Sequence, residues 1–341
     1  MQPSPPAAPH GDFLRTDGGV AVNIRPTRTF RSIFAALAVS TALLAGACSS
    51  STTSDTPTTS AVSDGSFPVT VESGPTGSGT DITIAARPTS IVSLSPSATE
   101  TLWAVGAGDQ VKAVDNQSDY PAGIPVTDLS GFSPNVEAIL GYAPDLVIAS
   151  DDMNDLVSGL QKAKVPTLLL PAATSIDDVY AQIERVAIAT GHEEEGAEVV
   201  SDMRTEIDAA VASVPAREQP LTYFHELDSS LYTVTSTSFI GQIYGLFGMK
   251  SIADAAAQGD YPQLSAEFVV QANPDLIFLA DSQCCGVTAE AVAARPGWNG
   301  MKAVTGNQIH VLDEDLSSRW GPRVTDQVKA VAAIVAQVPT A

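Results

Sequence analysis

Two stretches of the sequence, NVEAILGYAPDLVIA at residues 135–149 and SAEFVVQANPDLIFL at residues 265–279, share one pattern. Each begins with a good helix cap, carries a glutamate two positions later, and then reaches a Pro-Asp pair followed by an apolar run. The offset is 130 residues, both from Glu137 to Glu267 and from Asp145 to Asp275. The repetition predicts two α/β lobes of the same construction, each with a helix, a Pro-Asp turn and a buried strand of a parallel sheet.

The residues around this repeat alternate between short apolar runs and helical periodicity, which is typical of βαβ units. Alternating residues at 67–72 and 81–85, with glycines between them, predict an opening hairpin. Further strands are predicted at residues 91–94, 146–149, 222–225, 276–280 and 309–312. Ser97 and Glu100 have the spacing of a capping box, which predicts that a helix begins there.

Residues 176–214 are predicted to form the connection between the two lobes. Gly191 divides this segment, and the part after it has an apolar stripe at helical spacing. A helix of about 22 residues is about 33 Å long, enough to cross from one lobe to the next. We therefore expect an α/β fold with lobes at residues 67–175 and 215–341, joined by one long linking helix, and a ligand cleft between them.

Composition limits the classes of function. The chain has 341 residues, about two domains, and 44% of them are apolar, enough for buried cores. Lys and Arg number 17 against 39 Asp and Glu, a net charge of -22. Such an acidic surface repels phosphate backbones, so a nucleic-acid partner is not expected.

The start of the sequence has the parts of an export signal. A basic stretch leads into the apolar residues 33–47, which end in small residues before Cys48. This ending resembles a bacterial lipobox, although Ala45 stands where that pattern prefers leucine; ordinary cleavage is the alternative. We expect residues 1–47 to be a signal peptide, Cys48 to be lipidated, and the Ser/Thr-rich residues 48–66 to be a tether. The protein would then be anchored to the outer face of the cytoplasmic membrane.

Several motifs in the two predicted lobes resemble those of one protein family. They lie at residues 87–88, 95–100, 118–121, 135–137, 144–146, 231–234, 238–241, 261–265, 295–298 and 321–323. Their order and spacing are similar to the helical-backbone (class III) substrate-binding proteins of ABC importers for cobalamin, haem or ferric siderophores. Within that family the cobalamin-binding branch is the most similar. The resemblance covers about residues 67–338.

The resemblance implies ligand contacts on loops that follow strands, where open α/β sheets place ligands. Carried over by position, the candidates are Ser95, Pro96, Ser97, Tyr120, Phe132, Ser133, His225, Ser236, Tyr261, Arg319 and Trp320. Aromatic faces would pack on a large flat chelate while hydroxyls and amides hold its rim. The alternative for each residue is a role in a turn or in packing.

The resemblance also implies partners. Glu137 and Glu267 stand in the first turn of their helices, where an acid interacts well with the helix dipole. In the family, matching glutamates, one per lobe, dock on arginine pockets of the two permease subunits. The implied partners are therefore a permease dimer with its ATPase and a metal-chelate ligand, and the protein itself would be a monomer without a resident cofactor.

The sequence gives less support to a bare metal-ion site or to an enzyme. Of the four histidines, only His225 stands at a cleft-facing strand end, so a bare-ion site is not expected. Hydrolase, zinc-protease and Walker motifs are absent, and an enzyme is not expected. Cys284 and Cys285 can form a vicinal disulfide; free or metal-binding thiols are the alternatives. The alternative function is a bilobed structural or signalling lipoprotein that has lost transport.

Overall fold

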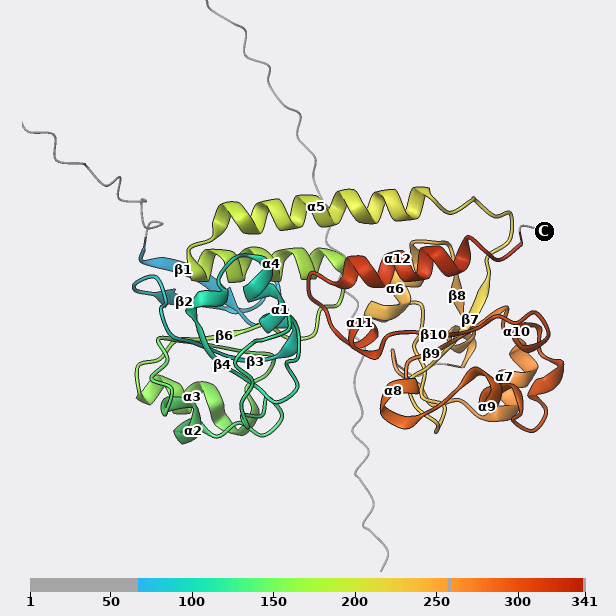
Figure 1. The fold of residues 1–341 in the computed structure, drawn as a ribbon, viewed down its shortest axis with the longest axis horizontal. Helices are drawn as coiled ribbons and strands as arrows, with labels where there is room; N and C mark the ends of the chain where they lie inside the picture. The colour runs from blue at the N-terminus through green and yellow to red at the C-terminus, as the bar shows by residue number, and fades with distance from the viewer. Residues whose placement is uncertain (1–66, 257–258, 340–341) are drawn as a thin grey trace, which may run out of the picture. The chain divides into compact units, whose positions relative to one another are not determined.

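The computed structural model describes residues 67–256 and 259–339. The predicted signal peptide, the tether and Cys48 lie outside the described residues. The described part contains two four-stranded parallel sheets, each with its own helices (Figure 1). The predicted fold class, two α/β lobes, is confirmed, whereas the exact lobe boundaries remain predictions.

The first lobe is built on a sheet with the strand order β4-β3-β5-β6. Its strands are β3 (Ile91–Leu94), β4 (Val111–Val114), β5 (Leu146–Ala149) and β6 (Thr167–Leu169). Its helices are α1 (Pro96–Ala104), α2 (Val136–Leu140), α3 (Leu156–Lys162) and α4 (Ile176–Thr190), with short 3-10 helices at Gly108–Gln110 and Met153–Asp155. Every residue of β3 and β5 is buried, as expected of central strands covered on both faces. The predicted hairpin is present as β1 (Val69–Ser73) and β2 (Thr80–Ile84).

The second lobe repeats this arrangement. Its sheet has the order β10-β9-β7-β8, which matches the first lobe when β7 is paired with β3 and β9 with β5. The strands are β7 (Thr222–Glu226), β8 (Lys250–Ser251), β9 (Leu276–Leu279) and β10 (Ile309–Val311). The helices are α6 (Phe239–Gly245), α7 (Ala266–Ala272), α8 (Ser282–Cys285), α9 (Ala289–Ala293), α10 (Lys302–Thr305), α11 (Glu314–Ser318) and α12 (Val324–Val335), with 3-10 helices at Ile252–Ala255 and Trp298–Gly300.

The Pro-Asp pairs of the repeat join two neighbouring strands in each lobe. Asp145 accepts hydrogen bonds from the backbone N–H groups of Thr89 and Ser90, at 2.8 and 3.0 Å, just before β3. Asp275 accepts them from the N–H and the hydroxyl of Thr222, at 2.9 and 2.8 Å, where β7 begins. Each aspartate therefore fixes where a central strand starts relative to its neighbour.

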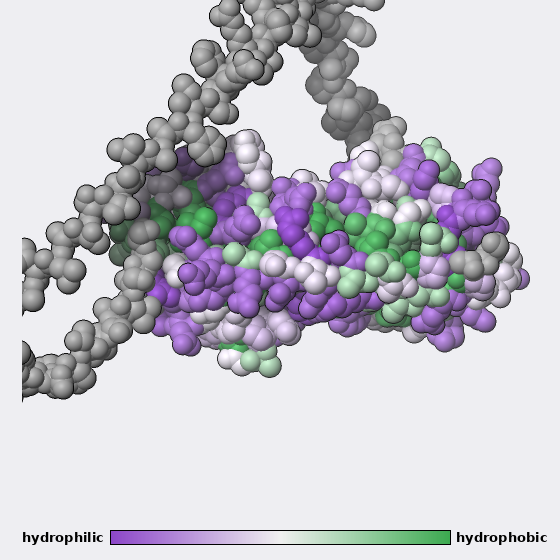
Figure 2. Space-filling view, turned by 90° about the horizontal axis from the view of Figure 1, so that it is seen from above, coloured by the Kyte–Doolittle hydropathy of each residue, from purple (hydrophilic) through white to green (hydrophobic). Residues whose placement is uncertain are grey.

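The linking helix is α5 (Glu193–Ala212), which lies against α4 of the first lobe and α12 of the second (Figure 1). Gly191 ends α4 with φ of 75°, a left-handed conformation that favours glycine. The inner face of α5 is buried through Val200, Met203 and Ile207, in a core cluster that also includes residues of both sheets. Figure 2 looks onto this side of the protein, which is largely hydrophilic with smaller hydrophobic areas. Within the described residues, no helix is long and apolar enough to cross a bilayer.

The start of α1 differs from the prediction. The sequence indicated a capping box of Ser97 and Glu100, but the helix begins earlier, at Pro96. The Ser95 hydroxyl accepts a hydrogen bond from the backbone N–H of Ala98, and proline suits the first helical position because it lacks a backbone N–H. Glu100 therefore lies inside the helix and has another role.

Glu100 forms a buried ionic contact between the lobes. Its side chain is 2% exposed and receives hydrogen bonds from Arg319 at 2.8 Å and from Arg323 at 3.0 Å. Both arginines belong to the second lobe, in the segment that enters α12. A carboxylate buried this deeply needs such partners, so the contact holds the two lobes together.

Replacing Glu100 by Gln should lower the free energy of unfolding by about 3 kcal/mol, because breaking a buried ion pair leaves charged partners uncompensated. Glutamine keeps the shape of the side chain, so the loss reports on charge and not on packing. Denaturant unfolding of the two forms at pH 7 measures the difference. The exposed Glu137→Gln variant is the control and should change stability by less than about 0.5 kcal/mol. An unchanged unfolding midpoint for Glu100→Gln would contradict the role given to this contact.

Candidate functional site

A cavity of about 330 Å³ lies between the lobes, at the carboxyl ends of β3, β4 and β5. The first lobe lines it with Leu94, Ser95, Pro96, Ser97, Asp115, Gln117, Gly131, Phe132, Ser150, Asp151 and Met153, and the second with Asp315, Ser318, Arg319 and Trp320. In the first sheet β4 and β5 lie on opposite sides of β3, so this position is the point where successive connections diverge. Open α/β sheets bind ligands at such points.

The cavity brings together six of the predicted ligand residues. They are Ser95, Pro96, Ser97, Phe132, Arg319 and Trp320. The backbone N–H of Trp320 donates a hydrogen bond to the Ser97 hydroxyl at 3.1 Å, which joins the two walls. Phe132 is 78% exposed, an unusual state for a phenylalanine. The two aromatic rings come from different lobes and offer apolar surface to one bound molecule.

Five predicted residues do not line this cavity: His225, described below, and four others. Tyr120 lies beside a different pocket, with the Arg323 guanidinium 4.2 Å from its ring centre. Ser133 follows Phe132 but is absent from the wall, and its backbone N–H donates to the Ser130 hydroxyl.

The remaining two lie in the second lobe. The hydroxyl and N–H of Ser236 bind Asp254, at 2.7 and 2.8 Å. Tyr261 is 52% exposed on a loop outside the cavity wall.

The prediction that His225 faces the cleft is wrong. His225 is completely buried in β7, with Nδ1 2.7 Å from the Tyr244 hydroxyl, and its ring packs edge-on to Tyr244. Burial lowers the pKa of His225 to about 3, so the imidazole is neutral. The predicted strand ended at His225, but β7 continues to Glu226, which takes the position at the strand end.

In the second lobe an ion pair occupies the position at the carboxyl end of β7. Glu226 is completely buried and receives two hydrogen bonds from Arg295, at 2.6 and 2.5 Å. Asp281, at the position equivalent to Asp151, is also buried, and neither of its oxygens has a hydrogen-bond partner within the described residues. Burial, with the neighbouring Glu226 carboxylate, raises the pKa of Asp281 to about 6. The two lobes therefore share a fold but differ where a ligand would bind.

Arg319 is already paired within the protein. Its guanidinium donates to Glu100 and Asp119, both at 2.8 Å, and to Asp315 at 2.7 Å. With three carboxylates around it, this arginine has little positive charge to offer to an anionic ligand. Its role is to hold the lobes and shape the cavity wall.

The wall of the cavity is acidic. Asp115, Asp151 and Asp315 line it together with a single cationic side chain, Arg319. Burial raises the pKa of Asp115 and of Asp315. Sequence analysis missed Asp115 because the strand before it, β4, was not predicted. Asp151 stands two residues after the end of a predicted strand, and this position was the signal that could have identified it.

The two repeated glutamates are exposed. Glu137 lies in the first turn of α2 and Glu267 in the first turn of α7, capped by Asn135 and Ser265 as predicted. Both helices lie on the side of their lobes away from α5 (Figure 1). In the part of the chain that the structure describes, neither carboxylate forms an ion pair.

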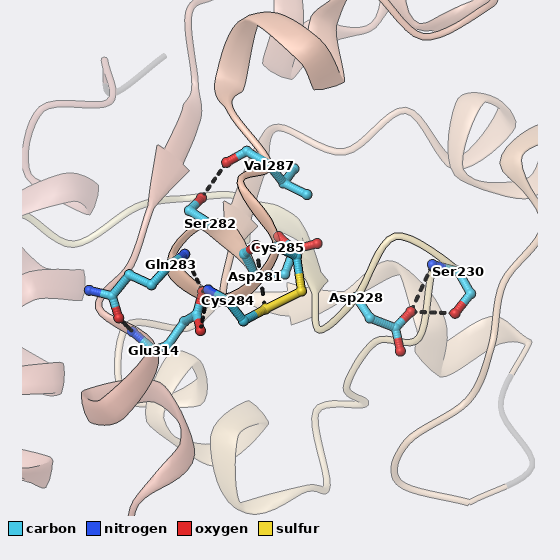
Figure 3. Close-up of a disulfide and its surroundings, with 9 residues drawn as sticks. All are labelled: Asp228, Ser230, Asp281, Ser282, Gln283, Cys284, Cys285, Val287 and Glu314. Carbon is cyan, nitrogen blue, oxygen red and sulfur yellow. Dashed lines mark hydrogen bonds between the residues drawn. A yellow bond between two sulfur atoms is a disulfide. The ribbon is translucent and has the colours of Figure 1, made fainter. Parts of the chain in front are cut away.

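Cys284 and Cys285 are bonded to each other in the structure, on α8 directly after β9 (Figure 3). Both residues are exposed. Of the alternatives that the sequence left open, the structure has the vicinal disulfide. Among the described residues, no group of three or more His, Cys, Asp or Glu side chains is arranged to hold a metal ion.

Comparison with known proteins gives consistent matches. Residues 91–316 match the family model described as periplasmic binding protein. The uncharacterized ABC transporter substrate-binding lipoprotein YvrC of Bacillus subtilis is 32% identical over 275 residues, covering 78% of this chain and 85% of that protein. The cobalamin-binding protein of Halobacterium salinarum is 33% identical over 278 residues, covering 78% and 74%.

Solved structures have the same fold. The periplasmic vitamin B12 binding protein BtuF of Vibrio cholerae superposes with a TM-score of 0.61 at 27% identity, covering 74% of this chain and 98% of that one. The periplasmic heme-binding protein RhuT from Roseiflexus sp. gives 0.65 at 23% identity, covering 73% and 98%, a likeness that shows the fold alone.

Asp281→Asn should raise the melting temperature by several degrees at pH 7.5. A carboxyl whose pKa is raised on folding binds more protons in the folded state, so wild-type stability falls as the pH rises from about 4 to about 6. Asparagine removes this cost, and the difference from wild type should shrink as the pH is lowered to 4.5. Thermal melts at several pH values test this, with the exposed Asp151→Asn as control. A difference that does not change with pH would contradict it.

Proposed function

The chain belongs to the periplasmic binding protein family, and we propose that it is the extracytoplasmic substrate-binding lipoprotein of an ABC importer. The cavity between the lobes carries this proposal, because both lobes contribute aromatic side chains, Phe132 and Trp320, to one site. A molecule bound there contacts both lobes at once, which lets a transporter recognise the loaded protein. The metal arrives as part of the cargo, and the protein needs no cofactor of its own.

We further propose that the cargo is a corrinoid. The acidic wall disfavours chelates with negative groups, such as haem with its two propionates or ferric complexes of carboxylate siderophores. A corrin ring has neutral amides at its rim, and Ser95, Ser97 and Gln117 offer hydroxyl and amide partners for them. The cobalamin-binding relative at 33% identity supports this choice.

The size of the cavity limits how much of such a ligand it can enclose. A volume of about 330 Å³ is at the lower end for ligand sites and is smaller than a whole corrinoid. The ligand therefore extends beyond the cavity along the cleft. Phe132, exposed at the rim, is placed to pack on the part outside.

The delivery step rests on Glu137 and Glu267. One exposed carboxylate per lobe, on equivalent helices, suits a permease dimer with two equivalent basic pockets. We propose that the permease, with its cytoplasmic ATPase, is the partner, that Cys48 carries the lipid anchor, and that the protein acts as a monomer without catalytic activity. No feature of the described residues favours the alternative of a structural or signalling lipoprotein.

The purified protein should bind cyanocobalamin with micromolar or lower Kd and haemin at least tenfold more weakly. Trp320→Ala should weaken cyanocobalamin binding about tenfold, since burying an aromatic side chain contributes ~1.5–3 kcal/mol. Titrations followed by absorbance measure both, and thermal melts confirm that the variant is folded. Tyr142→Ala, an aromatic residue outside the cavity, is the control. Tighter binding of haemin would overturn the corrinoid assignment, and full affinity in Trp320→Ala would remove Trp320 from the site.

Reversing both docking charges should separate binding from delivery. The Glu137→Lys, Glu267→Lys double variant should keep its affinity for the ligand but bind the permease one to several orders of magnitude more weakly, because a lost charge pair costs ~2–5 kcal/mol. Pull-down with the permease and cellular uptake measure this loss. Glu193→Lys, Glu194→Lys on α5 changes the net charge equally and should leave uptake intact. Normal uptake by the docking variant would show that both glutamates only stabilise their helices.

A further inference from the structure

The vicinal disulfide lies outside the cavity wall, on a helix that contacts the helix forming that wall. Helix α8, which contains Cys284 and Cys285, follows β9 at its carboxyl end. Figure 1 shows α8 on the side of the second lobe that faces the first. Both cysteines are exposed, so a reductant in solution can reach the sulfur atoms.

Glu314 connects α8 with α11. Its two carboxylate oxygens accept hydrogen bonds from the backbone N–H of Cys284, at 2.9 and 3.0 Å, and one of them also accepts from Gln283 (Figure 3). In return, the Gln283 side-chain oxygen accepts from the Glu314 N–H at 3.4 Å. The position of α8 therefore decides where the first residue of α11 lies.

Helix α11 in turn forms the second-lobe wall of the cavity. Asp315, the residue after Glu314, lines the cavity and holds Arg319 at 2.7 Å. Ser318 and Trp320 belong to the same wall. The residue that contacts the cysteine helix, Glu314, is thus the immediate neighbour in sequence of a residue of the cavity wall, Asp315.

The disulfide acts on the backbone of α8 itself, beside the hydrogen bonds that hold this helix to Glu314. A helix of four residues is too short to be stable by itself. It ends at Gly286 with φ of 69°, and the Ser282 hydroxyl donates to the carbonyl of Val287. The S–S bond is the one covalent cross-link in this part of the chain, and it restricts two of the four residues of the helix.

We propose that Cys284 and Cys285 form a thiol–disulfide exchange site whose state sets the affinity for the ligand. A dithiol reductant attacks one sulfur and breaks the S–S bond; two electrons and two protons pass to the pair, giving two thiols, while the dithiol becomes a disulfide. Reduction removes the restriction on the backbone at Cys284, whose N–H binds Glu314, and thereby loosens the α11 wall. The oxidised protein is the high-affinity form. The affinity readout rests on the proposed function.

The test compares cyanocobalamin binding by the oxidised protein and by protein reduced with dithiothreitol, which is removed under nitrogen before titration. The reduced form should bind about 3- to 30-fold more weakly. Cys284→Ser, Cys285→Ser should bind like the reduced form and should not respond to reductant. Glu314→Gln should bind weakly even when oxidised, and reduction should add little, because the connection is already broken. Equal affinity of the two wild-type forms would overturn the proposal.

Two further measurements keep this outcome separate from the proposed function. Alkylation and mass spectrometry of protein isolated without reductant should find no free thiol at Cys284 or Cys285, and two free thiols would overturn the exchange site. If the oxidised protein binds no cyanocobalamin, the proposed ligand fails, and amide hydrogen exchange then tests the exchange site by itself. Reduction should speed exchange in residues 282–287 and 313–320, and unchanged rates there would overturn the proposal.

Discussion

The arrangement of the lobes depends on one buried carboxylate. Glu100 comes from the first lobe and is neutralised by Arg319 and Arg323 from the second. A charge in this position cannot lose its partners without a large energetic cost, so the lobes stay in contact beside it. Because Arg319 also forms part of the cavity wall, the interaction that holds the lobes together also shapes the ligand site. Its pairing with acids removes the positive charge that an anionic ligand would need.

The fold could be predicted because its signals are local. Helix caps and apolar runs act on residues close in sequence, and the predicted strands and the division of the connection at Gly191 agree with the structure. The predicted capping box at Ser97 is wrong because the contacts of Glu100 are distant in the sequence. Glu100 has the right spacing for it, but its partners are 219 and 223 residues away, and spacing alone does not reveal so distant a contact.

The site was predictable only in part for a similar reason. First-lobe residues expected from the family resemblance, such as Ser95 and Phe132, line the cavity. His225 was expected at the end of its strand, but β7 continues to Glu226, so His225 lies inside the strand and is buried. The pair of Glu226 and Arg295, 69 residues apart, was not visible as a pair in the sequence.

This difference between the lobes decides which part of the site is adjustable. In the first lobe the cavity lies at the ends of strands in a sheet whose central strands, β3 and β5, are fully buried, with Ser95 capping α1. In the second lobe the same position is occupied by Glu226 and Arg295, and the cavity wall comes from α11 and the residues after it, outside the sheet. A short helix outside a sheet is held by few contacts and moves at lower cost than a central strand. Control of affinity is therefore expected in the second lobe, where Glu314 joins α11 to α8.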